Sequence, residues 1–178
     1  MKFQVNGPFR VPRNCNRLVA RDASAKREFW MQVDAAERGL SAACGCYIFV
    51  LSPRGGGAKP WYVGMTEKRG FRDECFQPHK INLYNEALAG YDKASPCLYL
   101  ISKLTSGGKE FAQSSANGHA DIVALEDFLI GIAYSQNQEL LNIRGTKFFK
   151  KAVIPGLMNT PPGRLLPPQA AIRRLLLW

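Results

Sequence analysis

The chain has 178 residues, and 46% of them are hydrophobic, so it is long enough to bury a core without disulfides or a structural metal. No run of about 18 apolar residues is present to span a bilayer, and the first residues lack the apolar centre of a signal peptide. We therefore expect a soluble, cytoplasmic protein with no membrane partner. The five cysteines show no paired metal-ligand or disulfide spacing, which predicts reduced thiols.

The net charge of +10 is unevenly distributed along the chain. Residues 1–27 hold seven Lys or Arg against one acid, and residues 144–178 hold seven against none. Residues 28–143 hold ten against thirteen, so the centre is slightly acidic. Basic ends around such a centre favour a polyanion, nucleic acid above all, as the partner. The simpler alternative is that the ends are solvated tails that keep the protein in solution.

The elements follow from hydrophobic spacing, Gly and Pro punctuation and capping residues. The first 23 residues show little periodicity and are predicted to be irregular. Two strands flank a glycine-rich turn at Ser52 to Gly57. The other predicted elements are helices at 25–38 (capped by Ser24), 67–76 (capped by Thr66), 78–89, 120–135 and 169–178, and a strand at 96–105.

The two strands within 44–66 each carry one tyrosine. Side chains alternate between the faces of a strand, so a register that sets Tyr47 opposite Tyr62 places both phenols on one face. The ordinary alternative is a hairpin whose tyrosines simply pack in the core.

Two charged residues occupy helix positions that packing alone would not select. Arg72 lies at the rim of the inward-facing arc of helix 67–76, and Glu126 lies inside the apolar arc of helix 120–135. A buried carboxylate is costly unless a cation meets it, so Glu126 predicts a metal ion or an ion pair with a neighbouring Arg or Lys.

These residues resemble the motifs of the GIY-YIG nuclease family. Gly45-Cys46-Tyr47 and Tyr62-Val63-Gly64 are similar to the two half-motifs that give the family its name. Arg72 stands ten residues after Tyr62, as the family's arginine does, and Glu126 lies in a later helix, like its metal-binding glutamate. The resemblance spans roughly Cys44 to Asn142 and implies a mixed α+β fold in which helices flank a small antiparallel three-stranded sheet.

The resemblance also implies roles for individual residues. Tyr47 would be the general base or water-positioning phenol and Tyr62 its partner, while Arg72 would clamp phosphate oxygens. Glu126 would bind Mg²⁺ or Mn²⁺, which suits a hard oxygen ligand. Asn142 would be a structural or phosphate contact.

Three further positions belong to the predicted site. Gly64 would keep the backbone close to the substrate. Several relatives carry a lysine directly after this glycine, where this chain has Met65, and a His or Tyr one turn beyond the arginine, where it has Phe76. Lys68 and His79 are near enough in sequence to substitute as substrate-binding residues.

We therefore expect a GIY-YIG type endonuclease at 44–143, between a basic N-terminal segment with a packing helix at 1–43 and a basic, proline-rich extension at 144–178. DNA is favoured over RNA by the resemblance alone. The first alternative is a nucleic-acid-binding module that keeps the fold but has lost efficient catalysis. A second is an interaction domain whose basic ends bind a protein partner.

Overall fold

The computed structural model describes residues 1–53, 57–91 and 93–176, and the predicted turn at Ser52 to Gly57 falls partly outside them. The chain divides into two compact units, residues 1–142 and residues 143–178.

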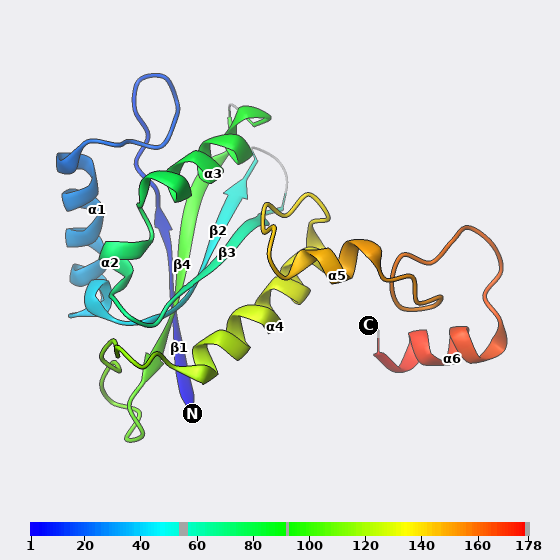
Figure 1. The fold of residues 1–178 in the computed structure, drawn as a ribbon. Coiled ribbons are helices and arrows are strands. Elements are labelled where there is room, and N and C mark those ends of the chain that lie inside the picture. The colour runs from blue at the N-terminus through cyan, green and yellow to red at the C-terminus, as the bar shows by residue number, and fades with distance from the viewer. Residues whose placement is uncertain (54–56, 92, 177–178) are drawn as a thin grey trace. The chain divides into compact units, whose positions relative to one another are not determined.

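The first unit is built on a single antiparallel sheet with the strand order β1-β4-β2-β3 (Figure 1). Its strands are β1 (Lys2–Arg10), β2 (Gly45–Ser52), β3 (Lys59–Thr66) and β4 (Ser95–Leu104). The predicted mixed α+β class with an antiparallel sheet is confirmed, but the prediction of three strands is wrong, because β1 adds a fourth.

The first strand, β1, was not predicted from the sequence. Gly7 and Pro8 interrupt its pattern, and the sheet register shifts between Asn6 and Phe9 to accommodate them. Proline cannot donate to a strand ladder, so it is tolerated at an irregular position of an edge strand such as this one. β1 pairs with β4 from Lys2 to Arg10. Lys2–Arg10 is therefore part of the sheet, so the prediction that the first 23 residues are irregular is wrong for this segment and holds for residues 11–22.

The hairpin of β2 and β3 has a different register from the predicted one. Tyr47 lies opposite Gly64, and Phe49 lies opposite Tyr62, with a shift between Phe49 and Val50. A Cβ at Gly64 would lie only 2.4 Å from Cζ of Tyr47, so the tyrosine ring occupies the space that a side chain would fill. Gly64 is therefore the residue on β3 that makes room for Tyr47.

Helices cover both faces of the sheet (Figure 1). The face that carries Tyr47 packs against α1 (Ala23–Ala36), α2 (Phe71–Glu74) and α3 (Pro78–Ala89). The opposite face carries Cys46 and packs against α4 (Ala120–Gln136).

The larger core lies on the first of these faces. It is formed by aromatic and aliphatic side chains of the sheet and of α1, α2 and α3, among them Tyr47, Phe49, Leu51, Leu98, Leu100, Phe29, Val33, Phe71, Ile81, Tyr84 and Leu88. The face under α4 holds two smaller clusters.

The start of α1 and the length of α2 differ from prediction. Asp22, not Ser24, caps α1, since its Oδ1 accepts from the backbone N–H of Ala25 at 2.8 Å. Thr66 does not cap a helix, because its hydroxyl donates to the carbonyl of Arg69 at 2.7 Å and closes a turn instead. The helix that follows begins only at Phe71 and is a single turn, α2.

The second unit contains α5 (Thr146–Lys151) and α6 (Pro167–Leu176). α6 begins two residues before the helix predicted at 169–178, whose last two residues lie outside the described part of the chain. In the parts of the chain that the structure describes, no helix is long and apolar enough to cross a membrane.

Candidate active site

The two motif tyrosines lie on the same face of the sheet. The ring centroids of Tyr47 and Tyr62 are 6.2 Å apart, and Tyr84 of α3 lies at the same centroid distance from Tyr62. Tyr47 and Tyr84 are fully buried, whereas Tyr62 keeps 8% of its surface exposed. Of the three phenols, Tyr62 is therefore the one that lies nearest to solvent.

A lysine and a glutamate complete a polar cluster at Tyr62. The Nζ atom of Lys80 donates to the hydroxyl of Tyr62 and lies 4.7 Å from the centroid of its ring. The same Nζ lies 3.7 Å from Oε1 of Glu74. The side chains of Lys80 and Glu74 are 12% and 16% exposed, so the cluster opens to solvent at its charged end.

Lys80 reaches Tyr62 because of its position on α3. Pro78 begins this helix, and its fixed φ suits the first turn. Lys80 and Tyr84 are four residues apart, so they lie on the same side of α3, one turn from each other. Tyr84 anchors that side in the core by stacking on Phe49 at 4.1 Å between ring centroids.

Beneath this cluster, two hydroxyls are buried without a hydrogen-bond partner of normal geometry, those of Tyr47 and Tyr84. Burial raises the pKa of Tyr47 well above its ordinary value, and nearby Tyr84 and Cys75 add to the effect. Burial likewise raises the pKa of Tyr84, although the Tyr47 hydroxyl acts on it in the opposite direction. Tyr47 therefore stays a neutral phenol, which does not suit a general base, whereas the hydroxyl of Tyr62 accepts a hydrogen bond from the charged side chain of Lys80.

Arg72, the residue predicted to bind phosphate oxygens, is bound by two side chains outside the tyrosine cluster. Its guanidinium lies 2.8 Å from the carboxylate of Asp34 in α1 and donates at 2.8 Å to the hydroxyl of Ser41. Ser41 belongs to the short 3₁₀ helix η1 (Leu40–Ala42). Arg72 thus joins α2 to α1 and η1 on the surface, and the structure does not bring it to the tyrosine hydroxyls.

Glu126 lies on the other side of the sheet from the tyrosines. It is half-buried on α4, and its charge acts on Cys46, which points to the face opposite that of Tyr47. Burial, and after it the Glu126 carboxylate, raises the pKa of the Cys46 thiol. Glu126 therefore acts on the face covered by α4, whereas Tyr47 and Tyr62 belong to the core on the other face of the sheet.

The same geometry decides how a divalent cation would fit. One carboxylate can hold Mg²⁺ or Mn²⁺ when water and substrate phosphates supply the other oxygens. A cation held by Glu126, however, would be separated from Tyr62 by the sheet. Among residues 1–53, 57–91 and 93–176, no three His, Cys, Asp or Glu side chains are grouped to hold a metal. The residues therefore do not fit a metal centre shared by Glu126 and Tyr62.

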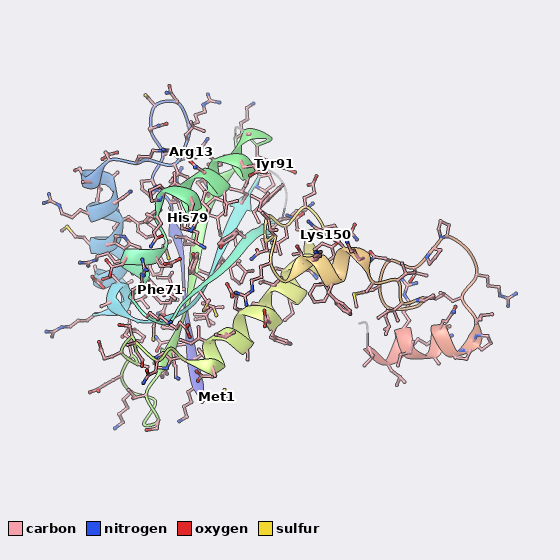
Figure 2. All side chains as sticks on the ribbon, in the orientation of Figure 1. Met1, Arg13, Phe71, His79, Tyr91 and Lys150 are labelled. Carbon is pink, nitrogen blue, oxygen red and sulfur yellow. The ribbon has the colours of Figure 1, made fainter. Side chains whose placement is uncertain are left out.

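The predicted substrate-binding residues fall into two groups. Lys68 is exposed in the turn after β3, and His79 is exposed in the first turn of α3, one residue before Lys80 (Figure 2). Gly64 and Asn142 are buried. Gly64 is part of β3, and the side chain of Asn142 hydrogen-bonds to the backbone of that strand.

Of the two roles predicted for Asn142, structural or phosphate contact, its hydrogen bonds favour the structural one. Its side chain accepts from the backbone N–H of Val63 at 2.9 Å and donates to the carbonyl of Val63 at 2.7 Å. Nearby, Asn137 donates to the carbonyl of Pro60, and the N–H of Leu141 to that of Trp61, both at 2.9 Å. The segment after α4 therefore covers the outer edge of β3, as an additional strand would.

Replacing Asn142 with alanine is expected to lower the free energy of unfolding by about 2 kcal/mol, because it leaves a buried donor and a buried acceptor unpaired. Urea unfolding followed by circular dichroism measures the change. The exposed Asn117→Ala is the matched control, with no expected change. Unchanged stability in Asn142→Ala would contradict the structural role.

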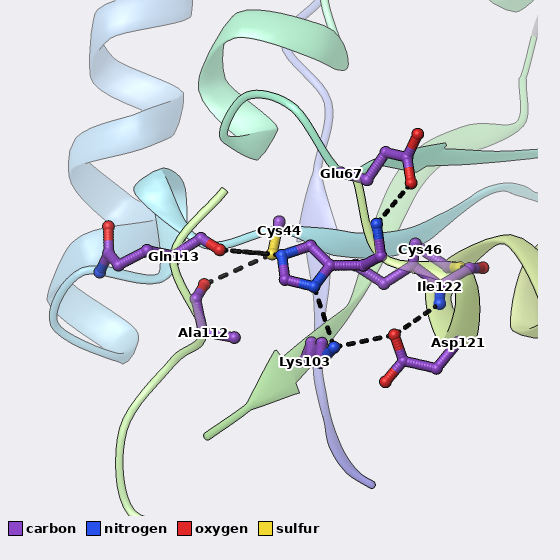
Figure 3. Close-up of polar contacts among 9 residues, drawn as sticks. Cys44, Cys46, Glu67, Lys103, Ala112, Gln113, Asp121 and Ile122 are labelled. Atoms are coloured by element: carbon purple, nitrogen blue, oxygen red, sulfur yellow. Dashed lines mark hydrogen bonds and ion pairs between the residues drawn. The ribbon is translucent and has the colours of Figure 1, made fainter. Parts of the chain in front are cut away.

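A second polar cluster lies where α4 begins (Figure 3). Nζ of Lys103 lies 2.8 Å from Oδ1 of Asp121 and 3.0 Å from Nδ1 of His119. An ammonium only donates, so Nδ1 accepts, and Nε2 of His119 donates to the carbonyl of Gln113 at 3.0 Å. The N–H of His119 donates to Glu67 at 2.7 Å. These paired groups fix the start of α4 against β4 and the turn after β3.

The electrostatics of this cluster support the same structural role. Burial alone would raise the pKa of Asp121, but the hydrogen bond and charge of Lys103 hold it below its ordinary value. Asp121 therefore remains a carboxylate that anchors Lys103.

The sequence does not single out Glu74, Lys80 or Tyr84 as members of a site. The signal that was available is the spacing of Lys80 and Tyr84, which places them on one side of a helix that follows the second motif tyrosine. Comparison with models of protein families, with curated proteins and with solved structures finds no match for this chain.

Proposed function

We propose that this protein hydrolyses phosphodiester bonds in nucleic acid, as an endonuclease of the GIY-YIG type. The observation that carries the proposal is the hydrogen bond from Lys80 to the hydroxyl of Tyr62, with Glu74 beside the ammonium. DNA as the substrate, and Mg²⁺ or Mn²⁺ as the cofactor, belong to the proposal through the family resemblance alone.

The order of elements supports the same class. From Gly45 to Gln136 the chain runs through β2, β3, α2, α3, β4 and α4, which is the β-β-α then α-β-α order that the resemblance implies. The glycine of the second half-motif has a physical reason in this fold, because Tyr47 fills the space above it.

The polar cluster supplies the groups that phosphodiester hydrolysis needs. In the proposed step Tyr62 reacts as its phenolate, paired with the Lys80 ammonium. A water oxygen attacks phosphorus as its proton passes to Oη of Tyr62, the bond to the leaving oxygen breaks, and that proton then passes to the leaving oxygen, which restores the phenolate. The ammonium of Lys80 stabilises the negative charge that develops on the phosphate oxygens. Glu74 lies beside the ammonium and positions it between the phenol and the solvent-exposed side.

Nicking of supercoiled plasmid by the full chain, with MgCl₂ or MnCl₂, tests this function. Lys80→Met removes the ammonium but keeps the apolar stem, and it is expected to slow nicking about a hundredfold, as the loss of one electrostatic donor typically does. Lys109→Met is the matched control, since Lys109 is exposed in the loop before α4. Nicking by Lys80→Met at the rate of the natural chain would refute the proposed site.

A second candidate is a nucleic-acid-binding module with little or no catalysis. Two observations favour it: Arg72 is bound by Asp34 and Ser41, and Glu126 acts on the opposite face of the sheet. In that case the chain would bind DNA, with an affinity that falls steeply as salt rises, but would not nick it at any Mg²⁺ or Mn²⁺ concentration.

A further inference from the structure

The second unit carries positive charge only. Residues 143–178 include seven Lys or Arg and no Asp or Glu. Three of these, Lys147, Lys150 and Lys151, belong to the six-residue helix α5 and are exposed (Figure 2 labels Lys150). Such a concentration of like charge on one short helix costs free energy through mutual repulsion unless an anion is bound.

The three lysines lie on one side of α5. At about 100° per residue, Lys150, Lys147 and Lys151 fall within an arc of about 100°, and Phe148 lies about 60° beyond Lys151. Phe149 points to the opposite side. The exposures agree, since Phe148 is 62% exposed and Phe149 is half-buried. α5 therefore presents an aromatic ring at the border of a basic surface.

The second unit holds this helix in place by its own contacts. The side-chain amide of Asn159 donates to the carbonyls of Phe149 and Ala152 at 2.6 and 2.7 Å, which satisfies the end of α5. At the start of the helix, the hydroxyl of Thr146 donates to the carbonyl of Ile143 at 3.4 Å. The ring of Phe149 meets that of Phe148 edge-on, at 5.6 Å between centroids. The exposed ring thus has a fixed support and is not a loose side chain.

We propose that this surface of α5, formed by Lys147, Phe148, Lys150 and Lys151, binds single-stranded nucleic acid. Ammonium groups pair with successive phosphates, and an exposed aromatic ring stacks on an unpaired base. A duplex would use the lysines but would not offer a free base face to Phe148. An anionic membrane would need a continuous apolar side, whereas Phe148 is the one exposed apolar residue of α5.

The inference rests on the proposed function for its class of ligand, and it adds the strand state and a binding site outside the candidate active site. Fluorescence anisotropy with the full chain tests it, using a labelled 20-nucleotide oligothymidine and a duplex of the same length. EDTA in the buffer keeps binding separate from metal-dependent cleavage.

Two variants carry the test. Replacing Lys147, Lys150 and Lys151 together by alanine is expected to reduce the slope of log affinity against log salt by about 2 for the oligothymidine, about 0.7 for each phosphate contact. Phe148→Ala is expected to weaken oligothymidine binding about tenfold and to leave duplex binding nearly unchanged. The control replaces Lys2, Lys59 and Lys109, three exposed lysines of the first unit.

An unchanged salt slope in the triple variant of α5 would overturn the inference. So would loss of binding to phosphatidylserine vesicles in that variant while its affinity for oligothymidine stays the same, because the partner would then be a membrane. Failure of the proposed function gives a different result: the natural chain would bind oligothymidine through α5 but would not nick plasmid.

Discussion

Tyr62→Phe is expected to slow plasmid nicking by about a thousandfold while leaving the fold intact. The substitution removes one oxygen atom, the one that accepts the hydrogen bond from Lys80. In the proposed mechanism this oxygen takes the proton from the attacking water, and general base catalysis of this kind contributes about 10² to 10⁴ in rate. The ring remains to pack beside Tyr47 and Tyr84, so the core keeps its shape.

Single-turnover nicking with protein in excess over plasmid measures this effect apart from product release. Tyr99→Phe is the matched control, because Tyr99 lies opposite Ile48 in the sheet and so belongs to the face covered by α4. Circular dichroism and thermal unfolding verify that both variants are folded. A rate for Tyr62→Phe within threefold of the Tyr99→Phe rate would exclude the phenol as the group that accepts the proton.

Tyr62→Phe also separates this site from the one that the sequence predicts. If Glu126 and Arg72 carry the chemistry, Glu126→Ala and Arg72→Ala will abolish nicking. In the structure Arg72 joins α2 to Asp34, and Glu126 lies on the α4 face. The geometry therefore predicts that both variants still nick plasmid, at rates reduced only as far as their stability is reduced.

The sequence predicted well those elements whose formation depends on local signals. α3 begins with proline and is followed by Gly90, and α4 has an apolar pattern over four turns, so the predicted bounds of both helices lie close to the observed ones. The hairpin was found from its β-branched and aromatic runs. The predicted register, with Tyr47 opposite Tyr62, is wrong, but both tyrosines still lie on one face because Gly64, the true partner of Tyr47, stands two residues from Tyr62.

The missed features depend on partners that are distant in the sequence. β1 is a strand because β4 pairs with it. Gly7 and Pro8 interrupt its alternation of polar and apolar residues, so the sequence does not predict that pairing. Helical periodicity predicts that Glu126 lies in the apolar arc of its helix, where it is half-buried, but it cannot tell which face of the sheet α4 covers. Nor can periodicity tell which side chains Arg72 meets, because its partners, Asp34 and Ser41, come from α1 and η1.

The candidate site shows this difference most clearly. In the sequence, nothing distinguishes Lys80 from other lysines on helices. In the structure, α3 packs on the face of the sheet that carries Tyr62. The ammonium then falls over the phenol ring, where it can stabilise charge. Spacing within α3 places Lys80 and Tyr84 on one side, but only tertiary packing decides that this side meets the motif tyrosine.

Gly64→Ala is expected to lower the free energy of unfolding by about 3 kcal/mol, at the upper end for inserting one methyl group into a packed core. The new Cβ would lie 2.4 Å from Cζ and 2.5 Å from Oη of Tyr47. The tyrosine cannot move away easily, because it is fully buried and its ring meets Phe71 edge-on at 6.5 Å between centroids. Either the ring or strand β3 must shift.

A double-mutant cycle identifies the clash as the cause. Tyr47→Leu shortens the side chain that opposes the new methyl group, so Gly64→Ala is expected to cost at least 1 kcal/mol less in that background, the size of coupling seen between residues in contact. Urea unfolding of the four proteins gives the coupling energy. Equal costs in both backgrounds would mean that the glycine serves the backbone and not the tyrosine. A large coupling would make Gly64 and Tyr47 one structural unit, in which the first half-motif provides the ring and the second provides the space for it.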